Sequence, residues 1–118
     1  MLVVEDEPMV RTMLEVALKR WGFAVVSTHD GADARERLKS GLRPCLILMN
    51  LNLPHLKAHA FREWQRQQPE LREIPVIVLS GGGLPVELRE DLQAAGYLSK
   101  PINFPALRAL LAKHCPAE

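Results

Sequence analysis

The sequence lacks long apolar runs and blocks of like charge. No stretch approaches the roughly 18 consecutive apolar residues that a membrane-spanning helix needs, and no signal-peptide pattern is present. The 15 basic and 14 acidic residues give a net charge of +1 and are spread along the chain. Domains that bind nucleic acid usually carry a clustered basic patch. We therefore expect this domain to contact neither a membrane nor nucleic acid.

Cysteine is also scarce. The two cysteines, Cys45 and Cys115, form neither a CxxC pair nor a metal-ligand spacing. Cys45 lies in an apolar run and is expected to be a small buried residue, whereas Cys115 lies in the C-terminal tail. Two free thiols fit a reducing compartment, so the cytoplasm is the simpler expectation. A bond between the two cysteines is the alternative.

The length and composition are those of one ordinary globular domain. A chain of 118 residues can bury a single core but not two. Hydrophobic residues make up 47% and charged residues 25% of the chain, which is typical of soluble proteins. We expect a single domain that spans residues 1–118.

Short apolar runs alternate with amphipathic stretches along the chain. One stretch has apolar residues at helical spacing, with Gly22 as the candidate C-cap. Gly96 is expected to cap a later helix, and Asn103 to begin the last one. The first stripe consists of Val10, Met13, Leu14, Ala17, Leu18 and Trp21. We predict strands at 2–4, 23–26, 45–49, 76–79 and 97–99, and helices at 8–21, from 31 to about 41, at 58–67, at 85–95 and from 103 onward.

The predicted strands are short and do not alternate strictly between apolar and polar residues. This pattern is typical of a parallel sheet that helices cover on both faces. Because crossovers are right-handed, the obvious arrangement of five strands is a doubly wound sheet in the order 2-1-3-4-5. In that order strands 1 and 3 flank the switch point, where open α/β sheets bind ligands.

Polar residues stand at the carboxyl ends of four predicted strands. Glu5 and Asp6 follow the first strand, Asn50 follows the third, Ser80 the fourth and Lys100 the fifth. Each alone has an ordinary explanation, such as a helix N-terminus or a turn. Their joint placement at the edge where this fold binds ligands indicates a functional site.

These residues lie in motifs that resemble the response-regulator receiver domain of two-component signalling, a flavodoxin-like (βα)5 fold. The resemblance covers essentially the whole chain in the right order and spacing. The matching segments are LVVEDEP at 2–8, LILMNLNLP at 46–54, IPVIVLS at 74–80 and GYLSKP at 96–101.

The resemblance implies a role for most of the site residues. Glu5 and Asp6 match the acidic pair that holds a divalent cation, usually Mg²⁺, and Asn52 matches the residue whose backbone carbonyl completes the metal site. Ser80 and Lys100 match the hydroxyl and the lysine that bind the phosphoryl group. Tyr97 matches the switch aromatic, which moves inward on phosphorylation.

Asn50 departs from this pattern, because it occupies the position of the phosphorylated aspartate. Acyl phosphate formation needs a carboxylate nucleophile, which an amide does not supply. With Asn50, the charge of the site falls from −2 to −1, counting Glu5 and Asp6 against Lys100. We therefore expect weak Mg²⁺ binding at best, with a salt bridge from Lys100 to the acidic pair as the alternative.

The sequence favours a pseudo-receiver, a module that keeps the fold and works by phosphorylation-independent protein interaction. The implied partners are a histidine kinase, a phosphotransferase or an output domain. The implied contact surface, which could also form a homodimer, comprises the helix at 85–95, the strand at 97–99 and the last helix. We expect no enzymatic activity.

Two alternatives remain open at this point. The chain could be a phosphorylatable receiver in which Asn50 replaces a natural aspartate, or one in which Asp6 is the acceptor. It could also be a small phosphate- or nucleotide-binding enzyme that uses the turn from Ser80 to Gly83. That turn lacks the Walker pattern, and no GxSxG motif is present.

Overall fold

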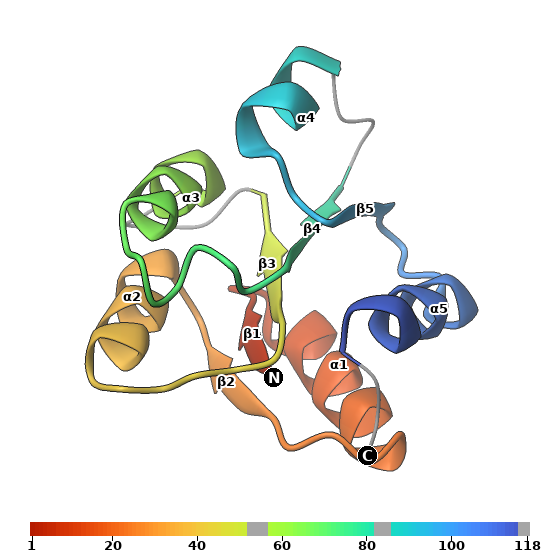
Figure 1. Ribbon diagram of the computed structural model, residues 1–118. Coiled ribbons are helices and arrows are strands. Elements are labelled where there is room, and N and C mark those ends of the chain that lie inside the picture. Colours follow the sequence, from red (N-terminus) through yellow and green to blue (C-terminus); the bar gives the residue numbers. More distant parts are fainter. Residues whose placement is uncertain (52–56, 82–85, 116–118) are drawn as a thin grey trace.

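The fold is a parallel β-sheet between two layers of helices, as the sequence predicts (Figure 1). The structure, a computed structural model, describes residues 1–51, 57–81 and 86–115. The described elements are β1 (Leu2–Val4), α1 (Pro8–Arg20), β2 (Val26–Thr28), α2 (Gly31–Lys39), β3 (Ile47–Asn50), α3 (Ala58–Arg66), β4 (Val76–Ser80), α4 (Val86–Leu92), β5 (Gly96–Ser99) and α5 (Phe104–His114).

The sheet has the predicted doubly wound order. Its strands run β2-β1-β3-β4-β5, and every neighbouring pair is parallel. The chain thus reverses its winding direction next to β1 and β3, whose carboxyl ends carry the acidic pair and Asn50. The predicted fold class and strand order are confirmed.

Each face of the sheet has its own apolar core, because the central strands are buried on both sides. On one face, Val4 and Met49 pack with Leu38 of α2 and Phe61 of α3. On the other face the core is formed largely by α1 and α5, through the fully buried Leu14, Leu18, Leu107 and Leu111. Figure 1 shows α2 and α3 on one side of the sheet and α1 and α5 on the other.

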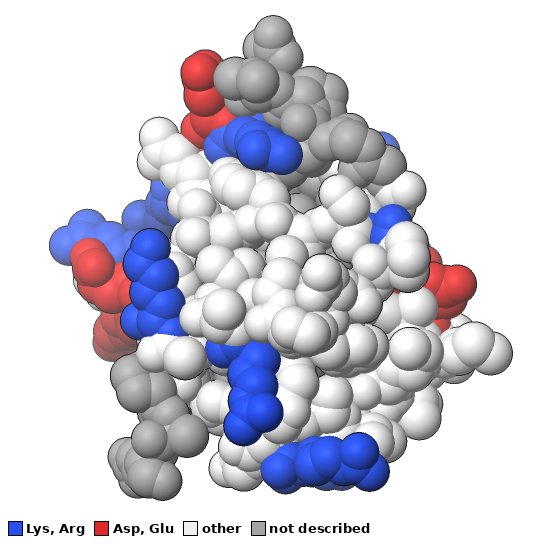
Figure 2. Space-filling view, turned by 90° about the vertical axis from the view of Figure 1, so that its right-hand side faces the viewer, with Lys and Arg blue, Asp and Glu red and all other residues white. Residues whose placement is uncertain are grey.

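The outer surface of α1 and α5 is largely uncharged (Figure 2). Met9, Met13 and Val16 of α1 are 75%, 47% and 53% exposed. Next to them, Trp21 packs edge-on against Phe104, with ring centroids 6.4 Å apart. The apolar residues of α1 therefore extend beyond the face of the helix that packs against the core. Met13 lies in the predicted stripe but is not part of the core, to which α1 contributes Leu14 and Leu18.

Two helix ends follow the sequence signals. Gly22 directly follows the C-cap Trp21 at a φ of 95°, a conformation that favours glycine. Asn103 caps α5, since its side chain accepts a hydrogen bond from the Ala106 amide. Gly96, in contrast, is not a helix cap. It is the first residue of β5, opposite Ile77, and a Cβ atom there would lie 3.1 Å from Leu110.

Other boundaries shift by a few residues. The second strand runs from Val26 to Thr28 rather than over 23–26, because pairing begins where Val26 meets Leu2. Phe23 and Val25 pack toward α1 and α5 instead. The third strand begins at Ile47 instead of residue 45. The fourth helix ends at Leu92 rather than at residue 95.

The two cysteines form a disulfide. Cys45 and Cys115 are joined across a sequence separation of 70, with their Cα atoms 5.7 Å apart. Cys45 is exposed, so its expected burial is wrong, and Cys115 is buried at the end of α5. The bond ties the segment before β3 to the end of the chain's last helix. It also removes the free thiols on which the expectation of a reducing compartment rested.

Candidate functional site

The candidate site lies at the carboxyl edge of β1, β3, β4 and β5, where the sequence predicts it. The parallel pairing of β1 with β3 places Glu5, which follows β1, beside Asn50, the last residue of β3. Glu5 is fully buried, Asn50 is 8% exposed and Asp6 is exposed. Lys100 enters the same edge from the end of β5, with its side chain 18% exposed.

The amide of Asn50 connects the two acidic residues. Its Nδ2 donates one hydrogen bond to Glu5 Oε1 at 3.1 Å and another to Asp6 Oδ1 at 3.0 Å. Both amide hydrogens thus have carboxylate acceptors. Hydrogen bonds to ionised acceptors are stronger than those between neutral groups. Asn50 therefore fastens β3 to the turn after β1.

Lys100 supplies the positive charge of the site. Its Nζ lies 3.0 Å from Glu5 Oε2 and 3.2 Å from Glu5 Oε1, so the buried carboxylate is paired. A third carboxylate oxygen, Glu7 Oε2, is 3.7 Å away. Burial raises the pKa of Glu5, while the hydrogen bond from Lys100 opposes this effect and stabilises the charged form. The salt bridge considered for Lys100 thus forms with Glu5.

Two further residues support the site without having been singled out from the sequence. Arg11, in the first half of α1, donates from Nη1 to the carbonyl oxygen of Glu5 at 2.8 Å. The amide of Glu7 donates to Glu5 Oε1 at 3.2 Å. Glu7 adjoins the acidic pair and could have been found by its position, but no sequence signal distinguishes Arg11 from any other arginine on a helix.

The remaining residues predicted for the site are Ser80, Tyr97 and Asn52. Ser80 ends β4 and is 7% exposed, and its carbonyl oxygen accepts from the Lys100 amide at 2.6 Å. Tyr97 sits in β5 opposite Val78, and its hydroxyl reaches the end of α4 rather than the acidic pair. Asn52 lies outside the described residues, so the predicted backbone ligand is not placed.

The oxygen ligands and N–H groups at this edge of the sheet determine what the site can bind. A divalent cation needs several oxygen ligands, and Glu5 and Asp6 are the acidic side chains that face Asn50. In the described part of the chain, no group of three or more His, Cys, Asp or Glu residues could hold a metal ion. The Asn50 amide presents N–H groups to both carboxylates. The arrangement is that of a closed hydrogen-bonded cluster.

Comparison with known proteins agrees with the fold. The Response regulator receiver domain family matches residues 1–112, and the chain belongs to this family. The polar-differentiation response regulator DivK of Brucella anthropi is 29% identical over 107 residues, which cover 88% of this chain and 85% of DivK.

Solved receiver structures are similar over nearly the whole chain. The receiver domain of the sensor histidine kinase PA1611 from Pseudomonas aeruginosa PAO1 has 32% identity and a TM-score of 0.84, and covers 96% of this chain and 93% of its own. That crystal structure has a magnesium ion coordinated in its active site cleft. The chemotaxis response regulator CheY4 of Vibrio cholerae has 25% identity and a TM-score of 0.86, with 95% and 94% covered.

The chain is thus a receiver domain of two-component signalling. Among the described residues, no helix is long and apolar enough to cross a membrane.

Proposed function

We propose that this receiver is a pseudo-receiver, which acts through protein contacts without being phosphorylated at residue 50. The observation that carries the proposal is the pair of hydrogen bonds from Asn50 Nδ2 to Glu5 and Asp6. The lone pair of an amide nitrogen is delocalised into its carbonyl group, so Asn50 offers neither a nucleophilic nitrogen nor the carboxylate oxygen that acyl phosphate formation needs. The site is closed by its own donors and needs neither a phosphoryl group nor a metal ion to be stable.

Magnesium binding in this chain is weak under the same proposal. Glu5 and Asp6 are the carboxylates that would hold the ion, as the resemblance to other receivers implies. To do so, Asn50 would have to turn its amide oxygen toward them, and both hydrogen bonds would be lost. Lys100 would also remain 3.0 Å from Glu5 and repel the cation.

The partners follow from the family. We infer that a histidine kinase, a phosphotransferase or an output domain binds the surface of α4, β5 and α5, and that the domain is not an enzyme. The same surface could join two copies of the chain. Contact with such partners would place the protein in the cytoplasm, where the Cys45–Cys115 bond would be open to reduction.

A phosphorylation assay tests the proposal directly. We expect intact mass spectrometry to find no phosphoryl adduct on the wild-type chain after incubation with acetyl phosphate and Mg²⁺. Asn50→Asp restores a carboxylate beside Glu5 and Asp6, and is the matched variant expected to gain one phosphoryl group. An adduct on the wild-type chain would overturn the proposal and favour the alternative acceptor, Asp6, whose carboxylate is exposed.

A titration separates weak metal binding from none. Trp and Tyr fluorescence is followed as Mg²⁺ is added to the wild-type chain and to Asn50→Asp. We expect saturation at least about tenfold earlier in the aspartate variant, because a third carboxylate adds charge and an oxygen ligand. Equal affinities would contradict the inference that the Asn50 amide disfavours the ion.

A further inference from the structure

The carboxyl-terminal end of α4 is held by side chains from other elements. A helix leaves its last four carbonyl groups without partners inside the helix. In α4, which has seven residues, these groups form a large share of the backbone. Short helices are marginal without tertiary contacts. What holds this end therefore determines where α4 lies.

Arg62 of α3 provides the main support. Its guanidinium donates from Nε to the carbonyl oxygen of Leu92 and from Nη2 to that of Gln93, both at 2.8 Å. A third bond runs from Nη1 to Gln65 Oε1, also at 2.8 Å. The Arg62 residue is 7% exposed. A buried arginine whose N–H groups donate to carbonyl oxygens in this way holds the helix end in a defined position, which a surface contact does not do.

Gln65 extends this support to the chain before β4. It is fully buried, accepts from Arg62, and donates from Nε2 to the carbonyl oxygens of Leu71 and Ile74 at 2.8 and 3.0 Å. These hydrogen bonds of Gln65 thus fix the position of the Arg62 guanidinium. One continuous polar network connects α3, the segment that leads into β4 and the end of α4.

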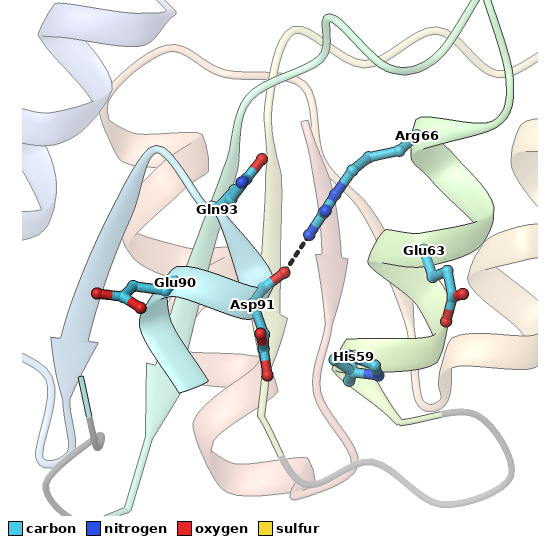
Figure 3. Close-up of a pocket in the computed structure, with 6 residues that line it drawn as sticks. All are labelled: His59, Glu63, Arg66, Glu90, Asp91 and Gln93. Carbon is cyan, nitrogen blue, oxygen red and sulfur yellow. Dashed lines mark hydrogen bonds between the residues drawn. The ribbon is translucent and has the colours of Figure 1, made fainter. Parts of the chain in front are cut away.

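Arg66 and Tyr97 complete the set. Arg66 donates to the carbonyl oxygen of Asp91, next to the pocket of about 290 Å³ between α3 and α4 (Figure 3). Tyr97 of β5 donates its hydroxyl to the carbonyl oxygen of Arg89 at 2.7 Å and accepts from the Ala94 amide at 2.9 Å. We call Arg62, Arg66 and Tyr97 the α4 clamp.

The charges of the α4 clamp fit the helix end that they contact. The carboxyl end of a helix carries partial negative charge, which cations stabilise. Burial lowers the pKa of Arg62, and the neighbouring Arg66 adds to this effect, yet a guanidinium stays protonated in proteins. Among the described residues no carboxylate forms an ion pair with Arg62. The carbonyl dipoles of Leu92, of Gln93 and of the Gln65 side chain balance its buried charge.

From this geometry we infer that the α4 clamp locks α4 and Tyr97 in one arrangement, with Arg62 as the positioning residue. Tyr97 then acts as a fixed tie between β5 and α4 and does not switch. The role of this lock rests on the proposed function, since it would keep the α4–β5–α5 surface in a single state without a phosphoryl group. The lock itself depends only on contacts in the free protein.

Hydrogen exchange followed by NMR tests the lock. The reporters are the amides of Gln93, which donates to Arg89 O, and Ala94, which donates to Tyr97. In Arg62→Met, which keeps the stem but removes every donor, we expect these two amides to exchange at least about tenfold faster, while amides of β1 and β3 report the loss of overall stability separately. Arg72→Met, at an exposed arginine after α3, is the matched control and should change neither set.

Each outcome decides for or against the lock. Unchanged exchange at Gln93 and Ala94 overturns it, and so does acceleration confined to the amides of β1 and β3, which would make Arg62 a general stability residue. Arg62→Lys keeps the charge but cannot reach three acceptors at once, so we expect it to resemble Arg62→Met. If the Arg62 variants do not fold, Tyr97→Phe decides: the Ala94 amide must exchange at least about threefold faster, or the lock is refuted.

The test is independent of phosphorylation. It uses the wild-type chain without a phosphoryl donor, so a failed lock leaves the mass-spectrometric result at residue 50 untouched. Conversely, a phosphoryl adduct on the wild-type chain would refute the pseudo-receiver while the exchange rates at Gln93 and Ala94 still report on the clamp.

Discussion

Both helical layers of this receiver pack on the sheet through apolar cores, but they differ in the further interactions that hold their helices in place. On the side of α3 and α4, a buried arginine and a buried glutamine fasten backbone carbonyls, and the outer pocket is lined by charged and polar side chains. On the side of α1 and α5, apolar side chains form both the core and much of the outer surface. A covalent bond, Cys45–Cys115, replaces the polar network there.

The two kinds of interaction differ in how strictly they fix the position of a helix. Apolar burial is non-directional and tolerates small displacements of a helix. Hydrogen bonds to a guanidinium require defined distances and angles, and a lost donor leaves buried carbonyls unsatisfied. The short α4 is therefore placed by geometry, whereas α1 and α5 are placed by shape and by the disulfide. The surface proposed to meet partners includes the helix that is placed most strictly.

Opening the disulfide should have the largest effect on stability. In the chain-entropy treatment, a cross-link that closes a loop of this size contributes about 4 kcal/mol. We expect Cys45→Ser with Cys115→Ser to lower the free energy of unfolding in urea by up to about that amount, with α5 affected most. The exposed Cys45 makes the wild-type bond accessible to a dithiol reductant.

The control for this prediction is the reductant itself. It should shift the urea midpoint of the wild-type chain and leave that of the double serine variant unchanged. Identical midpoints for the oxidised wild type and the variant would show that apolar packing alone secures the α1–α5 side, and the comparison between the two layers would become sharper.

Removing Arg62 should cost nearly as much on the other side. Arg62→Met leaves the carbonyl oxygens of Leu92 and Gln93 and the Oε1 of Gln65 buried without their donor, and we expect a loss of about 3 kcal/mol. Arg66→Met removes one bond at a less buried site and should cost less than about 1 kcal/mol. Urea unfolding measures both.

Equal losses of stability in Arg62→Met and Arg66→Met would contradict the comparison between the two layers. The buried network would then contribute no more to stability than an exposed hydrogen bond. A higher free energy of unfolding for Arg62→Met than for the wild type would also contradict the comparison. Replacement of buried charged groups by apolar ones can stabilise a protein, and this result would mean that the α4 clamp specifies position at the expense of stability.

The sequence predicted those features that arise from short-range patterns. Alternating apolar runs and helical stripes led to the sheet order, and the residues that end the strands led to Glu5, Asp6, Asn50 and Lys100 as one cluster. Both follow because parallel strands bring their carboxyl ends to one edge. The salt bridge from Lys100 was foreseen as an alternative, but its choice of Glu5 over Asp6 depends on burial.

What the sequence did not predict depends on contacts between distant residues. Nothing local to Arg62 distinguishes it from an exposed helix arginine, and its acceptors lie about 30 residues away. The disulfide spans most of the domain in the same way. Phe23 and Val25 look like strand residues, yet the strand β2 begins at Val26 because pairing with Leu2 fixes the register. Tertiary contacts override local propensity in each case.

The smallest effect is expected at the exposed apolar surface of α1. Met13 and Leu14 are neighbours in sequence, but Met13 is 47% exposed and Leu14 is fully buried. We expect Met13→Lys to change the free energy of unfolding by no more than about 0.5 kcal/mol, because lysine is a good helix former and little packing is lost. Leu14→Ala, the matched core variant, should cost about 3 kcal/mol through the cavity that it leaves.

Urea unfolding of these two variants determines whether the outer surface of α1 belongs to the fold. If Met13→Lys cost as much as Leu14→Ala, the exposed methionine would be part of the packing and the contrast between the two layers would fail. If the cost is small, the fold does not require an apolar residue there. The apolar character of that surface would then need a reason other than stability, because exposed apolar patches in soluble proteins usually mark contacts with other molecules.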